Sequence, residues 1–409
     1  MKKILALTVG GSSKPIVRSV LDHHPDKVLF FVTTFPDGGS KKKLLEKVNG
    51  EESIISSTGL IDSMYEIQEI KSPDNLTSCH KQIKQAMIRI VPEDRDCECI
   101  ADYTSGTKTM AVSLAIAALD LDWKMSIVQG ERTDLVKTLN GTEVVRLVST
   151  SSLLLERTLK QAVDLFDLGQ YEAVEEILRS FLSKMEISDE ATARVQRLLT
   201  LSRGFAAWDR FEHERALPFL RAQGAVVAKY VRSLNELLAE KKGSGYEKVW
   251  DLLRNAERRA RQGRFDDALL RLYRALEMFA QLRLRYQYEI DTSDVQLTKL
   301  PAQTQKLFSW QIAQNRKTIT AGFYDSYRLL NDLGDPIGPI YIRWRDKIKD
   351  LLGRRNRSIL AHGEDPIGQD IWQEAWVLTN GFLSEIAAAI NVRTAWPQFP
   401  TWKEVMEQS

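Results

Sequence analysis

The sequence predicts an α/β N-terminal domain, built on a parallel sheet with a terminal hairpin, followed by an all-α C-terminal half. Over the first 150 residues, short apolar runs alternate with stretches of helical periodicity. Such alternation is typical of a parallel sheet that is covered by helices on both faces. From Ser151 to about Val392, strand signals nearly vanish and the helical period takes over.

Five segments have the composition of buried strands: residues 3–9, 27–33, 65–70, 98–103 and 124–128. Helical stretches lie between them, for example residues 76–91 and 107–119. After the fifth strand we predict a hairpin over residues 135–148, turning at Asn140-Gly141, because this dipeptide strongly favours a two-residue turn. The pattern is Rossmann-like, and a doubly wound sheet would have the strand order 3-2-1-4-5.

The helical half contains three similar segments, each with an aromatic residue followed by an acidic residue and alanine. The aromatic residues are Tyr171, Phe211 and Phe265, and we expect each to lie at a turn between two helices. Gly243-Ser244-Gly245 marks a break, which predicts three domains: a ligand-binding domain at 1–150, a helical connector at 151–242 and a terminal helical domain at 243–409. The tail at 396–402 is expected to pack back on the helices.

Composition excludes several classes of protein. With 409 residues, a formal net charge of +2 and 43% hydrophobic residues, the chain is a multidomain globular protein and not a disordered one. We expect no membrane span and no signal peptide, because the apolar runs are short and no cleavage site follows the N-terminus. The three cysteines, Cys79, Cys97 and Cys99, argue against a disulfide framework and predict a reducing, cytoplasmic location.

The sequence also argues against a metal site or a resident cofactor. Histidine occurs five times, and neither an HExxH segment nor a Cys/His set with zinc spacing is present. The pair Cys97 and Cys99 is better interpreted as buried thiols on a strand than as metal ligands.

Two loops of the α/β domain are suited to phosphate. The first, beginning at Gly10, Gly11 and Ser12, follows the first strand, and the second, Thr104-Ser105-Gly106-Thr107-Lys108, follows the fourth. Backbone N–H groups, hydroxyls and a lysine at a helix N-terminus favour an anion. In the order 3-2-1-4-5 the two strands are neighbours at the switch point, so both loops should face one pocket. The alternative is that they are ordinary turns that cap helices.

A second candidate site is the segment Arg355-Asn356-Arg357 with His362. On a continuous helix, Arg355 and His362 would share a face two turns apart. Histidine exchanges protons near neutral pH, and arginine can hold a phosphate. The alternative is that His362, beside Gly363, belongs to an ordinary helix C-terminus without a function.

The distribution of charge favours a functional interpretation of this segment. Residues 343–357 contain seven basic and two acidic residues, and residues 254–285 contain nine basic and four acidic ones. Each segment therefore has a net charge of +5, which predicts a surface for a polyanion.

These two segments carry resemblances to known families. Thr104-Ser105-Gly106-Thr107-Lys108-Thr109-Met110 resembles the signature after the fourth strand of the CARF domain of CRISPR-associated proteins. Arg355-Asn356-x5-His362 resembles the R-x4-6-H motif of HEPN ribonucleases, and Arg357 also satisfies that spacing. The whole chain thus resembles a type III CRISPR accessory effector of the CARF–HEPN kind.

The first resemblance implies binding of a cyclic oligoadenylate, as an allosteric activator, across a homodimer. The implied ligand-binding residues are Gly10, Gly11, Ser12, Thr104, Ser105, Gly106, Thr107 and Lys108.

The second resemblance implies metal-independent cleavage of single-stranded RNA, in which the 2′-hydroxyl attacks and a 2′,3′-cyclic phosphate is left. It assigns proton transfer to His362, phosphate positioning to Arg355 and an orienting role to Asn356, with Arg357 as the alternative arginine. Two other functions stay open: a non-enzymatic, ligand-responsive regulator that binds nucleic acid, and degradation of the activator in the N-terminal pocket.

Overall fold

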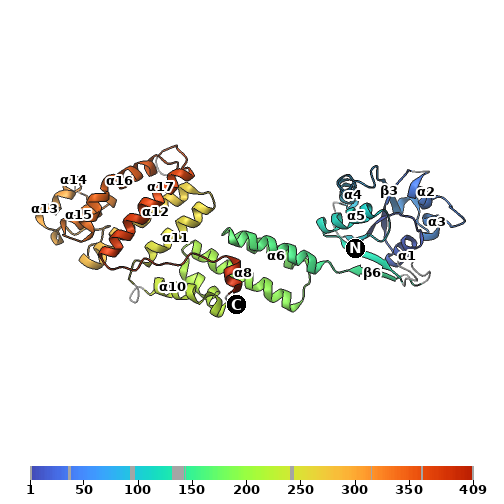
Figure 1. The fold of residues 1–409 in the computed structure, drawn as a ribbon, viewed down its shortest axis with the longest axis horizontal. Helices are drawn as coiled ribbons and strands as arrows, with labels where there is room; N and C mark the ends of the chain where they lie inside the picture. Colours follow the sequence, from blue (N-terminus) through green and yellow to red (C-terminus); the bar gives the residue numbers. More distant parts are fainter. Residues whose placement is uncertain are drawn as a thin grey trace. The chain divides into compact units, whose positions relative to one another are not determined.

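The computed structural model describes residues 2–35, 38–92, 97–130, 142, 144–239, 244–314, 316–360 and 363–407, without the side chains of Gln303 and Arg355. The chain forms two compact units, Met1–Arg157 and Thr158–Ser409 (Figure 1). Each unit is described by itself. The predicted boundary between residues 242 and 243 stays a prediction, and Gly243 lies outside the described residues.

The N-terminal unit contains a six-stranded sheet with the order β3-β2-β1-β4-β5-β6. The strands are β1 (Lys2–Thr8), β2 (Lys27–Val32), β3 (Tyr65–Glu69), β4 (Cys97–Asp102), β5 (Lys124–Gln129) and β6 (Val144–Val148). The first five are parallel, and β6 pairs antiparallel with β5. The predicted fold class and strand order are confirmed. The turn at Asn140-Gly141 lies outside the described residues.

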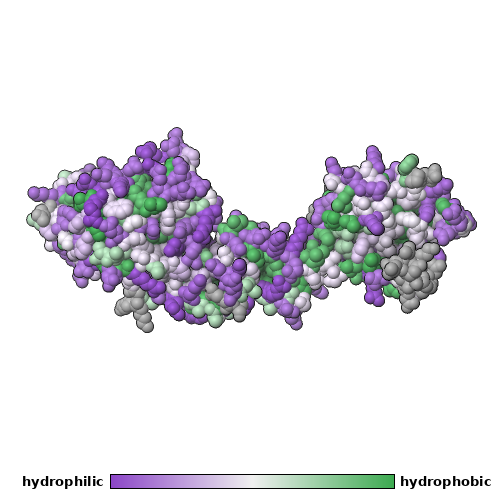
Figure 2. Space-filling view, in the orientation of Figure 1, coloured by the Kyte–Doolittle hydropathy of each residue, from purple (hydrophilic) through white to green (hydrophobic). Residues whose placement is uncertain are grey.

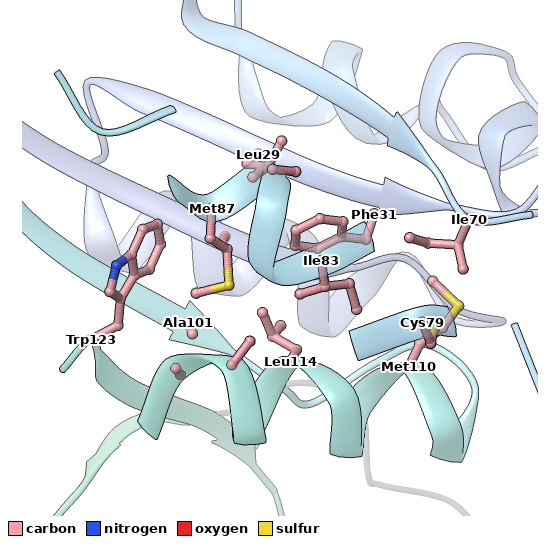
Figure 3. Close-up of a cluster of buried hydrophobic side chains, with 14 of the residues drawn as sticks. Leu29, Phe31, Ile70, Cys79, Ile83, Met87, Ala101, Met110, Leu114 and Trp123 are labelled. Atoms are coloured by element: carbon pink, nitrogen blue, oxygen red, sulfur yellow. The ribbon is translucent and has the colours of Figure 1, made fainter. Parts of the chain in front are cut away.

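Alternation along the central strands explains why helices cover both faces. In β2, Leu29 and Phe31 point to one face, where they meet the helices α4 (Leu76–Ile90) and α5 (Lys108–Asp120) (Figure 3). The intervening Phe30 points to the other face, toward α1 (Lys14–His23), α2 (Gly39–Leu45) and α3 (Ile54–Thr58). Since successive side chains of a strand alternate, a wholly apolar strand contributes to two cores.

The C-terminal unit is helical, as the sequence predicts. Its long helices are α6 (Ser151–Asp167), which begins in the N-terminal unit, α7 (Tyr171–Lys184), α8 (Asp189–Asp209), α9 (His213–Arg221), α10 (Ala228–Leu238), α11 (Glu247–Arg261), α12 (Phe265–Tyr288), α15 (Phe323–Asp332), α16 (Ile337–Arg357) and α17 (Gln369–Ala389). The short ones are α13 (Ala302–Gln305), α14 (Ser309–Ala313) and α18 (Trp402–Glu407). Tyr171 and Phe265 are the first residues of α7 and α12, and Phe211 lies in the turn between α8 and α9, so all three lie close to the predicted turns.

The C-terminal tail packs back on the helices, which confirms the expectation from its aromatic residues. The ring of Phe399 contacts Phe205 and Trp208 of α8, at centroid distances of 4.9 and 5.0 Å. The guanidinium carbon of Arg258 lies 3.6 Å from the centroid of the same ring. The tail therefore joins α8 to α11.

No helix among the described residues has both the length and the apolar character needed to cross a bilayer. On the visible face of both units, hydrophilic residues cover most of the surface and hydrophobic ones form smaller areas between them (Figure 2).

Candidate functional site

The two phosphate-suited loops interlock at the carboxyl edge of the sheet. β1 and β4 are paired, with Leu7 opposite Asp102, so the loops begin side by side. The N–H of Gly10 donates to Oγ of Ser105 over 3.1 Å, and the Thr8 hydroxyl donates to the Ser105 carbonyl oxygen. The structure thus brings together the two loops that the sequence analysis selected.

Glycine is required where these loops touch. A Cβ on Gly10 would lie 2.5 Å from the backbone nitrogen of Gly106. Gly106 has a φ of +96°, and a Cβ there would lie 2.7 Å from Cβ of Thr8. Gly11, by contrast, faces open space. Gly10 and Gly106 therefore permit the close approach of the loops, while Gly11 leaves the adjacent backbone accessible.

A buried carboxylate holds the second loop. Asp102 is 3% exposed, and its Oδ1 accepts from the N–H of Thr104 over 2.9 Å. Its Oδ2 accepts from the hydroxyls of Ser19, over 2.7 Å, and Ser126, over 3.2 Å. The Ser126 hydroxyl also lies 2.9 Å from Nε2 of His23, whose pKa is lowered mainly by burial. Asp102 therefore positions the second loop. We did not predict this role, although an acidic residue at the end of a buried strand is a sequence signal for one.

The N-termini of two helices lie at this edge. Thr107 caps α5: its hydroxyl accepts from the N–H of Met110 over 3.1 Å and donates to the carbonyl of Pro73 over 3.0 Å. Lys108 is then the first residue of α5 and is exposed. The helix α1 begins at Lys14, after the first loop. Unpaired N–H groups at helix N-termini attract anions, and the two exposed lysines add positive charge.

A third lysine reaches this site from α2. Nζ of Lys43 donates to the carbonyl oxygen of Gly11. Its neighbour Lys41 pairs with Glu69, and Lys42 is exposed. The sequence analysis missed Lys43. The available signal was its position after the second strand, because the carboxyl ends of parallel strands meet at one edge.

The C-terminal segment differs from the continuous helix that the spacing predicted. Helix α16 ends at Arg357, and the chain then folds back on that end. The N–H of Asp365 donates to the Arg357 carbonyl over 3.2 Å, and the N–H of Ile359 donates to the Asp365 carbonyl over 3.1 Å. A Cβ on Gly363 would overlap the carbonyl group of Arg357, so this approach requires glycine. The prediction that a continuous helix joins Arg355 to His362 is wrong, because the folded-back chain takes up the last carbonyl groups of the helix.

The described part of this segment places Asn356 and Arg357 at the exposed end of α16. His362 and the side chain of Arg355 lie outside the described residues.

Much of the positive charge counted along residues 254–285 is neutralised by acids that are distant in sequence. Nε of Arg258 lies 2.7 Å from Oδ1 of Asp209, and Arg259 pairs with the same carboxylate. Nε of Arg283 lies 2.7 Å from Oδ2 of the buried Asp335. Arg258, Arg259 and Arg283 are therefore not available to a polyanion, and the exposed arginines of the segment are Arg261, Arg264 and Arg285.

On α16 the basic residues differ in their pairing. Arg343 pairs with Glu385, and Arg354 pairs with Glu374 at 2.5 Å and with Asp350 at 3.2 Å. Lys347 and Lys349 are exposed, and Nζ of Lys347 lies 5.3 Å from the ring centroid of Trp344. Basic groups thus remain at the surface of α16, close in sequence to the Arg355–Arg357 segment.

The chemistry of the cysteine pair agrees with thiols that are packed on a strand. The sulfurs of Cys97 and Cys99 lie 3.7 Å apart on β4, and both residues are partly buried. Burial raises the pKa of the Cys99 thiol to about 12. Over the residues that the structure covers, no group of three or more His, Cys, Asp and Glu side chains is arranged to hold a metal ion.

Comparison with known families finds two models that together match residues 154–384. The family model described as the Csm6 HEPN domain matches residues 238–384, and the one described as the Csm6 6H domain matches residues 154–257. No curated protein matches the sequence.

Among solved structures, that of Enterococcus italicus Csm6 bound to cyclic hexa-2′-fluoro-hexa-dAMP aligns with a TM-score of 0.61 and 14% identity, covering 95% of both chains. At this identity the likeness concerns the fold. The structure of a type III CRISPR defence DNA nuclease activated by cyclic oligoadenylate aligns over 50% of this chain and 34% of the other, with 13% identity and a TM-score of 0.26.

Proposed function

This chain belongs to the CARF–HEPN effectors of CRISPR defence, and on that premise we propose that it is a ribonuclease of type III systems that a cyclic oligoadenylate activates. The proposal includes a homodimer, metal-independent cleavage of single-stranded RNA and a cytoplasmic location. The activator would bind in the N-terminal unit, and the RNA would be cut in the C-terminal unit.

One observation carries the activator site: the interlocked loops at the carboxyl ends of β1 and β4. The open space at Gly11, the exposed Lys108 and the two helix N-termini suit an anionic ring. The fold is that of a relative whose structure contains a cyclic adenylate analogue, which supports this ligand class. We assign ligand binding to Gly10, Gly11, Ser12, Thr104, Ser105, Gly106, Thr107 and Lys108.

RNA cleavage would use the folded-back segment after α16. In this proposal, neutral His362 takes the proton of the ribose 2′-hydroxyl, whose oxygen attacks the adjacent phosphorus. The bond to the 5′-oxygen breaks, the leaving oxygen takes up a proton from the protonated His362, and a 2′,3′-cyclic phosphate remains. Arg355 or Arg357 stabilises the charge that develops on the phosphate, and Asn356 orients the phosphate group. Two copies of the segment would form one cleft in the homodimer.

The direct test is cleavage of a labelled single-stranded RNA with and without each cyclic oligoadenylate. We expect cleavage that depends on one ring size, persists in EDTA and yields cyclic phosphate ends. His362→Ala should lower turnover on the order of 10²-fold or more, while Lys349→Ala, an exposed α16 variant, should retain it. Cleavage that survives His362→Ala, or that EDTA abolishes, contradicts the proposed mechanism. RNA binding without any cleavage would favour the non-enzymatic regulator.

A further inference from the structure

A cavity of about 500 Å³ lies in the C-terminal unit, between the α11–α12 turn and the beginning of α17. We call it the tryptophan cavity, and its lining includes Phe265, Trp372, Trp376, Arg261, Glu257 and Gln373. The rings of Trp372 and Trp376 are stacked, with centroids 5.7 Å apart and an interplanar angle of 28°. Trp372 is 8% exposed and supports Trp376, which is less buried.

A hydrogen bond and an ion pair connect the walls of the cavity to the proposed RNA-cleaving segment. Asp266, next to Phe265, accepts the N–H of Ile367 over 3.1 Å, and Ile367 lies on the chain that leads from His362 to α17. On α17, Glu374 pairs with Arg354, the residue before Arg355. One wall of the cavity, α17, is therefore paired with α16, and the turn that forms the other wall is hydrogen-bonded to the loop between α16 and α17.

The lining has the chemistry of a nucleobase site. Aromatic rings present faces on which the bases of single-stranded nucleic acid stack, largely independent of sequence. The volume is within the range of small-molecule sites. At the edges, the amide of Gln373 can pair with a base. Oε2 of Glu257 accepts from Arg254 and Gln398, and the other oxygen of this carboxylate can accept from a base N–H. The exposed Arg261 supplies the positive charge for a neighbouring phosphate.

We propose that the tryptophan cavity binds one base of the single-stranded RNA, stacked on Trp376, while a neighbouring part of the strand occupies the cleavage site. This inference rests on the proposed ribonuclease function and extends it by a substrate subsite. Stacking on Trp376 contributes affinity for any base, while polar contacts with Glu257 and Gln373 provide a preference among bases.

The test measures equilibrium binding of a fluorescein-labelled single-stranded RNA to the full chain carrying His362→Ala, which prevents cleavage. Adding Trp376→Ala should weaken binding about 5- to 150-fold, as loss of one base–aromatic stack does. Trp376→Phe should restore most of the affinity. The matched control is Trp310→Ala, because Trp310 is a tryptophan of the same unit, 50% exposed, that does not line this cavity.

Two further measurements separate a base site from a merely structural tryptophan. In Trp376→Ala, replacing the stacked nucleotide by an abasic one should cause no further loss, whereas in the parent protein it should. Arg261→Gln should lower the slope of log affinity against log salt by about 0.7, the share of one phosphate contact.

Equal RNA affinity of the Trp376→Ala and Trp310→Ala proteins would overturn the inference. So would a loss of affinity that is accompanied by a changed oligomeric state in sedimentation, because the cavity would then be a contact between proteins. A parent protein that binds no single-stranded RNA would instead contradict the proposed function itself, and the cavity with it.

Discussion

At the scale of single residues, the N-terminal site depends on glycines that differ in what surrounds them. Atoms of Gly106 and Ser105 lie close to where a Cβ of residue 10 would be. At the next residue, Gly11, no atom lies within 4 Å of that position. A methyl group at residue 10 must separate the two loops, while one at residue 11 meets nothing. Two adjacent positions thus offer a matched pair of substitutions.

We predict that Gly10→Ala weakens binding of the cyclic oligoadenylate tenfold or more, because the loops can no longer interlock. Gly11→Ala should weaken binding less, because its methyl group meets no protein atom within 4 Å and leaves the loops interlocked. Calorimetry with both variants checks this, and circular dichroism confirms that each is folded. The prediction is wrong if the two variants bind equally well.

At the scale of elements, α2 is the helix whose contribution to the site only the structure identified. Lys43 and Lys42 are adjacent and carry the same charge, yet only Lys43 contacts the first loop, through the Gly11 carbonyl. An anion bound at this loop competes with that carbonyl for the ammonium group. Helix α2 therefore brings a cation to the edge where the activator is proposed to bind.

We predict that Lys43→Ala weakens activator binding about tenfold or more, the effect of removing one charge-assisted contact of about 1.5–3 kcal/mol. Lys42→Ala, which changes the net charge by the same amount, should leave the affinity within twofold. Lys43→Arg should recover part of the loss. If both alanine variants lose the same affinity, the effect is one of general charge and Lys43 has no specific contact.

The end of α16 and the loop after it form the second element on which function depends. Gly363 lies against the Arg357 carbonyl, and Gly353, inside the same helix, has only an ordinary contact at 3.7 Å. Because both residues are glycines, replacement by alanine adds the same group, one methyl, at either position.

Gly363→Ala should abolish most RNA cleavage while activator binding is retained, because the added methyl group forces the folded-back chain off the end of α16. Gly353→Ala should cleave normally and melt at the same or a slightly higher temperature, since alanine is favoured over glycine inside a helix by about 1 kcal/mol. Cleavage assays and thermal melts on both variants test this prediction. Normal cleavage by Gly363→Ala would show that this backbone contact does not position the site.

At the scale of the whole molecule, the proposed function couples two sites that lie in different units. An activator can shift a conformational equilibrium only by its differential affinity for the two states. A variant of the activator site and a variant of the cleavage site should therefore fail in different ways.

Lys108→Ala should raise the activator concentration needed for half-maximal cleavage tenfold or more, and cleavage should return in part at saturation. His362→Ala should bind the activator normally and stay inactive at every concentration. Lys81→Ala, an exposed lysine on α4, is the control for net charge. Activator affinity that is unchanged in Lys108→Ala, together with lost cleavage, would place Lys108 in the transmission of the signal or in the fold.

The sequence by itself determined the sheet, its order and the helical half, because these follow from local patterns. Apolar runs such as β2 are buried on both faces wherever helices alternate with strands, and parallel connections then bring the loops after β1 and β4 to one edge. Tyr171, Phe211 and Phe265 were predicted close to turns for the same reason, since each lies within two residues of the start of a helix.

Only the tertiary structure decided which charges remain at the surface, where α16 ends and what surrounds the two sites. Asp209 neutralises Arg258 from 49 positions away, Lys43 reaches Gly11 across 32, and Gly363 ends α16 by backbone contact with Arg357. The stacked pair at Trp372 and Trp376 becomes a cavity only where α17 meets the turn before α12. Periodicity and propensity act within a few residues, whereas ion pairs, close backbone approach and cavities join positions whose separation along the chain carries no signal.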